Sequence, residues 1–561
     1  MSGHLLLVCS ALFVMLLVVG PRMGLDRRFR NLCRNHGSWL IYLPLFLFLG
    51  IFLSLGVWYL TLQGYAGEVE PLISSVSWLM NHGQPLYHEI NSPARYSVLY
   101  GPSVYLTNGL FLQIFDPNLA VTKLPSLLAG ILSLFFLYVA TARTKVDRIA
   151  ALAVLLAILF YWNQGFSIYL VRPDAFLVFA VGFGLVALTR TRGLLAALAM
   201  GAALGYAINL KIHAGFYFLP LLVLFQQRNG WRLLSGSLVV GLLLTLAPFM
   251  LHPQISGINY ILWIKNAAGH GLCVETITDT CRYAVALVLP LALILAMDGN
   301  VRRNVSRDRN LYLSILASLM GILVLSTKPG AGLVHLLPLV PVMVFLAADK
   351  AQTMNHQHWC KIDTTNSRLF RGRCAMAALF IAIFFTGSIH TYRSSCLVEW
   401  QNRDSEELAE DIEGILNDYS DLKISMACGG EDEFFRSTWM RPLLVFADNP
   451  VLIDPIAVMD CRKAGLEISE GTFKAIKNGK VGMWLVPRNQ KPFQKTNWYA
   501  PHDVIFPERF LDYFVEHYTR QGHTRFFDLW FWNGLKPKLP VQGSLAAGGV
   551  GSQIPDGKMA K

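Results

Sequence analysis

The sequence predicts a mainly α-helical, polytopic membrane protein: a bundle of 11–12 transmembrane helices with a C-terminal extracytoplasmic α/β domain. Hydrophobic residues make up 54% of the 561 positions, and charged residues only 15%. A soluble domain cannot cover its surface with so few charges, so much of the chain must lie in lipid. Apolar runs of about spanning length recur as far as residue 390 and then stop.

These runs divide the chain into three parts. Residues 1–38 hold an apolar segment and a basic loop, residues 39–390 form the transmembrane domain, and residues 391–561 have the mixed composition of a soluble domain. Five arginines follow the first run, which is the wrong flank for a secretory signal peptide, so it is either an extra span or lies outside the functional core. The predicted spans are 4–20, 39–62, 121–141, 149–163, 171–189, 193–209, 214–225, 233–251, 283–297, 311–326, 333–348 and 374–390.

Basic residues are distributed unequally between the loops. One set of alternate loops carries 21 lysines and arginines, and the other set carries seven. The positive-inside rule places the first set in the cytoplasm, so the loops 63–120 and 252–282 and everything after residue 391 are predicted to lie outside. The net charge of +12 therefore reflects topology, and no nucleic-acid partner is expected.

The nine cysteines are too few for a disulfide scaffold. The pairs Cys273 with Cys281 and Cys428 with Cys461 each share a predicted outer segment, and the sequence leaves disulfides and free thiols equally open. An N-x-S/T site at Asn304 falls on the predicted cytoplasmic side, and the outer segments have none. This favours a bacterial inner membrane over the secretory pathway.

The first long outer loop carries two carboxylates, Glu68 and Glu70, directly after a span. Pro71 suits a first helical position, and residues 71–80 predict a short amphipathic helix on the membrane surface, with Trp78 at headgroup level. The run 121–141 already supplies the one span needed before the next cytoplasmic loop. The apolar stretch 103–115 is therefore predicted to be interfacial or re-entrant, which leaves a cleft where lipid and water meet.

A series of short motifs runs through residues 39–350. They are Glu68-x-Glu70, His82 to Tyr87, Tyr100-Gly101-Pro102, Leu124-Pro125-Ser126, Arg172-Pro173-Asp174, Lys328-Pro329-Gly330-Ala331 and His335 to Pro338. In order and spacing the chain resembles the GT-C superfamily of membrane glycosyltransferases, which includes protein O-mannosyltransferases, the lipid A aminoarabinose transferase and the bacterial RgtA/B/C/D-like enzymes. Many members have an aspartate where this chain has only glutamates, so the choice between the two glutamates stays open.

The resemblance implies a catalytic group of carboxylates at the outer face. Glu68 or Glu70 would take the proton of the acceptor hydroxyl as general base. Asp174 would orient the donor or the acceptor. The alternative for the glutamates is a solvated pair that caps a helix, and for Asp174 it is a local ion pair with Arg172.

The resemblance also implies a binding site for the phosphate of the donor, because negative charge that develops on the leaving group needs fixed cations. The candidates are Lys328, Arg172, Lys211 and His213. His335 is expected only to form hydrogen bonds between helices. A divalent metal that bridges carboxylate and phosphate stays open, and no nucleotide cofactor is expected.

The C-terminal part predicts a small α/β domain without a catalytic motif. Residues 405–420 have the apolar period of an amphipathic helix, and the short runs 422–427, 443–447 and 481–486 predict strands. The aromatic residues between 526 and 532 are expected to pack on a sheet or to dock on the membrane. Residues 548–561 are expected to be disordered.

These features predict a glycosyltransferase, inverting by resemblance, that moves a sugar from a polyprenyl-phosphate-linked donor to an envelope acceptor (glycan, lipid or protein). Two alternatives remain. A transporter or flippase of lipid-linked sugars would place its charges near the bilayer midplane, in halves related by a repeat. A non-catalytic envelope scaffold would keep the fold without needing Glu68, Glu70 or Lys328.

Overall fold

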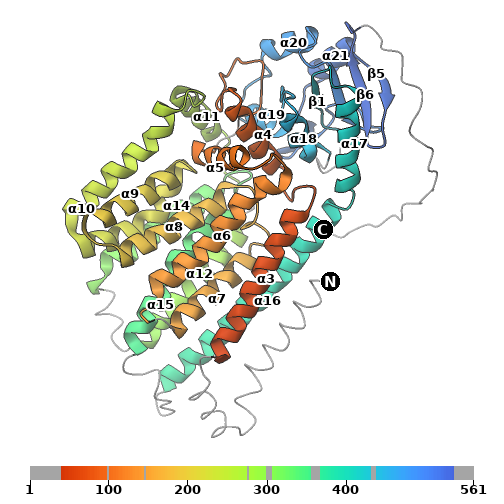
Figure 1. Cartoon of the computed structure of the whole chain (residues 1–561). Coiled ribbons are helices and arrows are strands. Elements are labelled where there is room, and N and C mark those ends of the chain that lie inside the picture. The colour runs from red at the N-terminus through yellow and green to blue at the C-terminus, as the bar shows by residue number, and fades with distance from the viewer. Residues whose placement is uncertain are drawn as a thin grey trace.

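The computed structural model describes residues 39–97, 100–144, 147–273, 277–298, 306–355, 367–430 and 437–535. A long helical bundle is capped at one end by a smaller domain, which holds all the long strands of the described part of the chain (Figure 1). The predicted fold class is confirmed. The predicted span 4–20, the N-x-S/T site at Asn304 and the predicted disordered end lie outside the described residues.

The bundle is built from long apolar helices. Within the described ranges, eight helices are long and apolar enough to cross a membrane, and α7 and α9 are shorter apolar helices. The bundle helices are α3 (Trp39–Thr61), α6 (Leu119–Thr141), α7 (Arg148–Trp162), α8 (Pro173–Arg190), α9 (Gly193–Ile208), α10 (Gly215–Leu251), α12 (Ile277–Met297), α14 (Arg309–Ser326), α15 (Val340–Asn355) and α16 (Ser367–Gln401).

Helix α10 is a hairpin of two helices joined at Gly230, whose φ of 79° is available to glycine at no steric cost. Arg228 in the first half approaches the carbonyl of Leu188 at the end of α8. In the second half, the carbonyl of Leu244 accepts a hydrogen bond of 2.9 Å from Asn209, at the end of α9. The two halves therefore run in opposite directions, which agrees with the two predicted spans 214–225 and 233–251.

Two further helices, α4 (Glu70–Asn81) and α5 (Pro102–Ile114), lie between the bundle and the C-terminal domain (Figure 1). Helix α5 has 13 residues and is about 20 Å long, which is too short to span a bilayer, as the loop parity predicts. The polar face predicted for α4 is wrong. Its serines Ser74, Ser75 and Ser77 are fully buried. Ser74 faces the bundle, where Tyr65 Oη donates to its hydroxyl at 2.9 Å and also lies 2.9 Å from Thr122 Oγ1 of α6.

The position predicted for Trp78 of α4 is also wrong. Its ring lies 5.5 Å from that of Phe446 in α18 (Arg441–Phe446), with a T-shaped geometry. The indole therefore packs on the C-terminal domain, where the sequence predicted a position among lipid headgroups. A domain about 370 residues further along the chain supplies this contact, so no local pattern could reveal it.

The C-terminal domain has a four-stranded sheet with the order β1-β2-β6-β5. Strands β1 (Ile424–Met426) and β2 (Met483–Pro487) are parallel, and β6 (Phe527–Trp532) pairs antiparallel with β2 and β5 (Tyr518–His523). The amphipathic helix predicted at 405–420 is α17 (Ser405–Asp418). The strands predicted at 422–427 and 481–486 are confirmed as β1 and β2. The strand predicted at 443–447 is wrong, because these residues belong mainly to α18.

The rest of the domain surrounds this sheet with η3 (Thr438–Met440), α19 (Pro455–Lys463), α20 (Glu470–Lys477), α21 (Glu508–His517) and the small strands β3 (Thr496–Asn497) and β4 (Ala500–Val504). The aromatic cluster forms most of β6, so of its two predicted roles the structure shows packing in the sheet. In the described part of the chain no disulfide joins Cys273 to Cys281 or Cys428 to Cys461.

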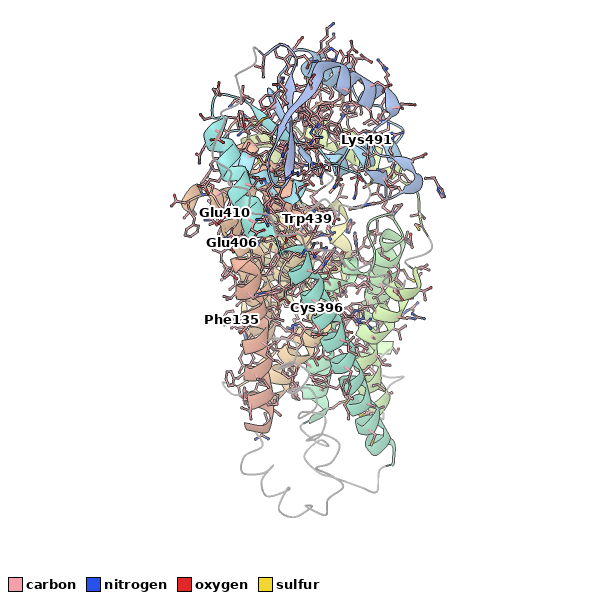
Figure 2. The ribbon with its side chains drawn as sticks, turned by 90° about the vertical axis from the view of Figure 1, so that its right-hand side faces the viewer. Phe135, Cys396, Glu406, Glu410, Trp439 and Lys491 are labelled. Carbon is pink, nitrogen blue, oxygen red and sulfur yellow. The ribbon has the colours of Figure 1, made fainter. Side chains whose placement is uncertain are left out.

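Helix α16 carries the chain from the bundle into the C-terminal domain; Cys396, labelled in Figure 2, lies on this helix below the domain. Residue 391, the predicted start of the domain, lies inside α16, which ends at Gln401. The loop before α5 also joins the domain: Arg95 N–H donates to Leu452 O, and Asp454 N–H donates to Arg95 O, both at 2.8 Å. The loop and the domain therefore form one continuous backbone network.

Candidate active site

Glu70, at the start of α4, is fully buried and accepts hydrogen bonds on both carboxylate oxygens. Tyr59 Oη lies 2.8 and 2.7 Å from the two oxygens, Ala66 N–H donates to Oε1 at 3.0 Å, and Val171 N–H donates to Oε2 at 2.7 Å. Burial raises the pKa of the Glu70 carboxyl, although the hydrogen bonds and the charge of Lys123 oppose this rise. Glu70 thus ties the end of α3 to the segment before α8.

Lys123 of α6 holds the end of α3 in place beside Glu70. Its Nζ donates to the carbonyls of Leu62 at 2.7 Å and Tyr59 at 3.1 Å. The ammonium group is buried and acts electrostatically on Glu70. With its acceptor capacity used, Glu70 is a structural group that fixes the turn 64–70. Glu68, in the same turn, is only half-buried, so it is the accessible carboxylate of the pair.

Asp174 is the second buried carboxylate, in the first turn of α8. Lys211 Nζ donates to Asp174 Oδ1 at 2.7 Å, and Arg172 Nε lies 3.8 Å from Oδ2. Asp174 is fully buried and Lys211 is 5% exposed. Proline at the start of α8 sets the helix start here, so Arg172 and Asp174 flank the turn as the motif predicts.

Two stacked histidines adjoin this ion pair. The rings of His213 and His335 are 5.2 Å apart, and Tyr217 Oη donates to the carbonyl of His335 at 2.8 Å. Both imidazole rings interact electrostatically with Lys211 and Asp174. The interhelical role predicted for His335 is carried by its backbone, while its ring faces His213.

Several polar atoms of this cluster are buried and lack a hydrogen-bond partner: Arg172 Nε, Asp174 Oδ2, His213 Nε2 and His335 Nδ1. Native proteins satisfy nearly all buried polar atoms. These four atoms lie together, next to the cationic side chains of Arg172 and Lys211. They indicate a site for a polar ligand. They lie at the start of α8, in the short segment η1 (Ile212–Ala214) before α10, and in the segment η2 (Leu333–Leu339).

Lys328 lies in the loop between α14 and η2 and is half-buried. Its Nζ lies 3.5 Å from the carbonyl of Ala267, and its charge acts on His213 and on His270. The carboxylates of Glu68 and Asp174 both stabilise the positive charge of Arg172. The structure therefore brings Glu68, Asp174, Arg172, Lys211, His213 and Lys328 into one electrostatic neighbourhood and leaves Glu70 beneath it as an anchor.

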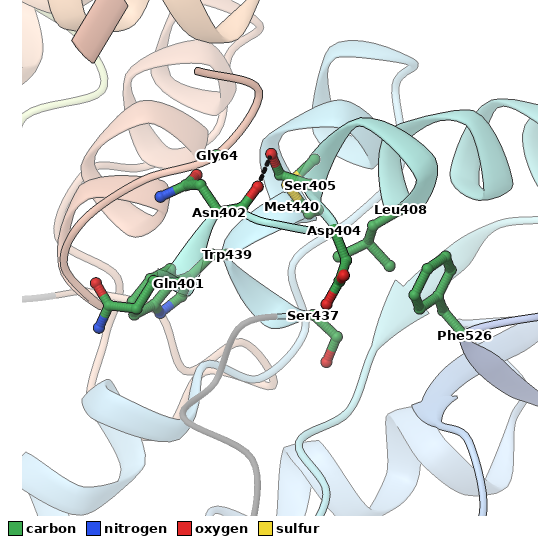
Figure 3. A pocket seen from close by; sticks show the side chains of 10 residues that line it. All are labelled: Gly64, Gln401, Asn402, Asp404, Ser405, Leu408, Ser437, Trp439, Met440 and Phe526. Carbon is green, nitrogen blue, oxygen red and sulfur yellow. Dashed lines mark hydrogen bonds between the residues drawn. The ribbon is translucent and has the colours of Figure 1, made fainter. Parts of the chain in front are cut away.

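Within the ranges that the structure describes, no group of three histidine, cysteine, aspartate or glutamate side chains is placed to hold a metal ion. A pocket of about 120 Å³ lies elsewhere, where α16 enters the C-terminal domain (Figure 3). Asn402 and Ser405 line it, and Ser405 Oγ donates to the carbonyl of Asn402 at 2.8 Å. None of the predicted site residues lines this pocket, which belongs to the joint between the two parts of the molecule.

Sequence reasoning missed several residues of this neighbourhood. Tyr59 and Lys123 lie inside predicted spans or at their ends. Tyr499 and Asp460, which share a hydrogen bond of 2.9 Å, lie in the C-terminal domain beside the loop of Lys328. Only Lys123 carried a signal, since a lysine at the start of an apolar span is costly unless it is paired. Nothing local marks the other three.

Comparisons with known proteins agree with this architecture. Residues 100–255 match the family model described as dolichyl-phosphate-mannose-protein mannosyltransferase. The fold is similar to that of ArnT from Cupriavidus metallidurans bound to undecaprenyl phosphate, with a TM-score of 0.51 and 15% identity over 88% of this chain and 99% of that chain. No curated protein matches the sequence.

Two other solved structures are similar at lower scores. They are ArnT from the same organism in the apo state, with a TM-score of 0.49 and 16% identity over 79% of this chain and 92% of that chain, and the Archaeoglobus fulgidus oligosaccharyltransferase complex with Zn and sulfate, with a TM-score of 0.40 and 11% identity over 82% and 67%. The resemblance to GT-C glycosyltransferases predicted from the motifs is confirmed.

Proposed function

We propose that the protein is a glycosyltransferase that moves a sugar from a polyprenyl-phosphate-linked donor to an envelope acceptor at the outer face of a bacterial inner membrane. The observation that carries this proposal is the meeting of one accessible carboxylate, Glu68, with a buried cationic cluster beneath the C-terminal domain. The shared fold with ArnT bound to undecaprenyl phosphate supports a donor of the same lipid-phosphate class.

The proposed reaction is a single displacement at the anomeric carbon of the donor sugar. Glu68 accepts the proton of the acceptor hydroxyl as its oxygen forms a bond to that carbon. The bond between the carbon and the phosphate oxygen breaks, and its electron pair leaves with the lipid phosphate. Arg172 and Lys328 stabilise the negative charge that develops there, while Lys211 is held by Asp174. Attack from the face opposite the phosphate inverts the anomeric centre.

The placement of the charges also argues against the transporter alternative. The cluster lies at the end of the bundle that meets the C-terminal domain, since Lys211 Nζ lies 5.7 Å from the ring centroid of Tyr100 in the loop before α5, and Lys328 Nζ lies 3.5 Å from the carbonyl of Ala267. Transporter binding sites lie near the bilayer midplane between repeated halves. The half-buried Glu68 beside buried cations fits an enzyme that must admit water-borne and lipid-borne substrates together.

The test uses the purified full-length chain in lipid nanodiscs with a panel of radiolabelled undecaprenyl-phosphate sugars and an envelope extract as acceptor. Glu68→Gln should lower sugar transfer by about a hundredfold or more. Lys328→Ala should lower transfer as well, by weakening stabilisation of the leaving phosphate. Glu89→Gln, at an exposed glutamate of the same loop, is the matched control and should transfer as the wild type does. Equal transfer by all four proteins would contradict the roles of Glu68 and Lys328, and no transfer by the wild type with any donor would contradict the enzyme proposal.

A further inference from the structure

Two polar side chains of the C-terminal domain lie at the joint with the bundle and have no part in the mechanism above. Tyr499 Oη donates a hydrogen bond of 2.9 Å to Asp460 Oδ1. Tyr499 lies in the turn between β3 and β4, and Asp460 lies in the last turns of α19. Both are half-buried, so they line the joint without being sealed in it.

This pair is held against the loops that carry the proposed phosphate site. His270 Nε2 lies 3.0 Å from the carbonyl of Asp460, and its ring is 6.0 Å from that of Tyr499. A Cβ atom at Gly330 would lie 3.3 Å from Tyr499 Oη. The phenol therefore reaches the loop that begins at Lys328.

The Tyr499–Asp460 pair interacts electrostatically with the groups around it, including the proposed base. Burial raises the pKa of the Asp460 carboxyl to about 7, Asp454 adds to the rise and the Tyr499 hydrogen bond opposes it. Burial and the Asp460 carboxyl also raise the pKa of the Tyr499 phenol, with further contributions from Tyr100 and Glu68. Glu68 therefore belongs to the electrostatic environment of the Tyr499 phenol, and the phenol lies against the loop of Lys328 at Gly330.

We propose that Tyr499, oriented by Asp460, binds one hydroxyl of a saccharide acceptor and so turns a neighbouring hydroxyl toward Glu68. Because the phenolic proton is donated to Asp460, the phenolic oxygen keeps its lone pairs as acceptors for a substrate hydroxyl. Saccharides present adjacent hydroxyls beside apolar C–H faces, and the rings of Tyr100 and Tyr499 offer matching apolar surface. The inference rests on the proposed glycosyltransferase function and assigns the acceptor side of that site.

The test separates acceptor binding from donor chemistry by offering two nucleophiles. Water releases free sugar from the donor and needs the phosphate site, whereas octyl glycosides with different head groups serve as saccharide acceptors. Tyr499→Phe keeps the ring and deletes the hydroxyl. It should raise the KM for the octyl glycoside roughly fivefold to tenfold, the value of one hydrogen bond, and leave kcat and the rate of donor hydrolysis near the wild type.

Matched controls come from the same domain. Tyr513→Phe removes the hydroxyl of a half-buried tyrosine on α21 and should change neither nucleophile. Asp460→Ala should raise the same KM by a smaller factor, because the phenol stays but loses its fixed direction.

The outcomes are distinct. Equal acceptor KM for Tyr499→Phe and Tyr513→Phe would overturn the inference, and so would an equal loss of hydrolysis and transfer in Tyr499→Phe. Hydrolysis by the wild type without transfer to any octyl glycoside contradicts a saccharide acceptor. If the wild type neither hydrolyses nor transfers with any donor, the proposed function itself fails and the inference falls with it.

Discussion

The two ends of the helical bundle use charged side chains in different ways. At the end far from the C-terminal domain, Asp147 accepts hydrogen bonds from Arg143 N–H at 2.8 Å, Ile149 N–H at 2.9 Å, Ala150 N–H at 3.1 Å and Gln352 Nε2 at 3.1 Å. Both carboxylate oxygens are therefore used. This aspartate caps α7 and ties it to α15, which is a purely structural task.

At the end beneath the C-terminal domain, the carboxylate of Asp174 is incompletely satisfied. Its Oδ1 is bonded to Lys211, but Oδ2 has no hydrogen-bond partner, and the ring nitrogens His213 Nε2 and His335 Nδ1 have none either. The residue types are similar at both ends, so composition does not separate scaffold from site. The separating feature is whether the buried polar atoms are satisfied by the protein itself.

The largest contrast is expected from removing one partner of an ion pair at each end. Asp174→Ala leaves Lys211 buried without a counter-charge, which should lower the free energy of unfolding by about 3–5 kcal/mol. Asp349→Ala breaks the surface pair with Arg143, whose side chains are 34% and 44% exposed, and should cost about 0–1 kcal/mol. Thermal unfolding of both variants in the same detergent compares them. Similar losses of stability would remove the contrast between the two ends.

A smaller effect is expected where the fully satisfied Glu70 supports the site from below. Glu70→Gln sets an amide N–H₂ against a backbone N–H, either Ala66 or Val171, and should lower the free energy of unfolding by about 1–3 kcal/mol. Because Glu70 anchors the turn of Glu68, kcat for sugar transfer should fall while the donor KM changes little. The control is Glu89→Gln at an exposed position of the loop. A Glu70→Gln enzyme with full kcat would show that the anchor does not position Glu68.

The smallest effect concerns the pH dependence of the joint. The pKa of Asp460 is raised to about 7, above its ordinary value near 3.9, so the folded chain binds a proton that the unfolded chain releases. The associated stability is present at low pH and is lost as the pH rises through 7, amounting to about 1.4 kcal/mol between pH 6 and pH 8.

Asp460→Asn cannot titrate, so the melting temperature of the wild type should fall relative to this variant over that interval. The groups that face the carboxyl are Tyr499, Asp454, His270 and Lys463. Burial lowers the pKa of the His270 imidazole below its ordinary value. Parallel melting curves across the interval would show that Asp460 is not protonated in the folded protein.

The sequence predicts the bundle well because lipid leaves only one solution for each apolar run, a helix whose length the bilayer sets. Even the hairpin at Gly230 was visible as two runs with basic residues between them. The motif Arg172-Pro173-Asp174 could be placed because proline fixes a helix start. These features depend on neighbours in the sequence, so periodicity and charge suffice to find them.

Contacts between distant segments could not be predicted in this way. The serines of α4 have the pattern of a water-facing side, yet in the folded chain they are buried and Ser74 accepts a hydrogen bond from Tyr65. Residues 443–447 have the apolar run of a strand, although Pro442 starts a helix there. Glu70 is the buried carboxylate and Glu68 the accessible one because Val171 and Tyr59, from two other segments, donate hydrogen bonds to Glu70. Burial, which decides each of these cases, is a property of the folded chain.

The pairing of Arg95 with residues 452–454 also has a consequence for biosynthesis. The early loop obtains its backbone partners from a segment made more than 350 residues later, after every helix of the bundle has been translated. The loop that carries Glu68 and Tyr100 therefore reaches its final shape only when the C-terminal domain has been delivered to it. Incomplete chains can insert their helices into the bilayer, but they lack a finished site until synthesis has passed this segment.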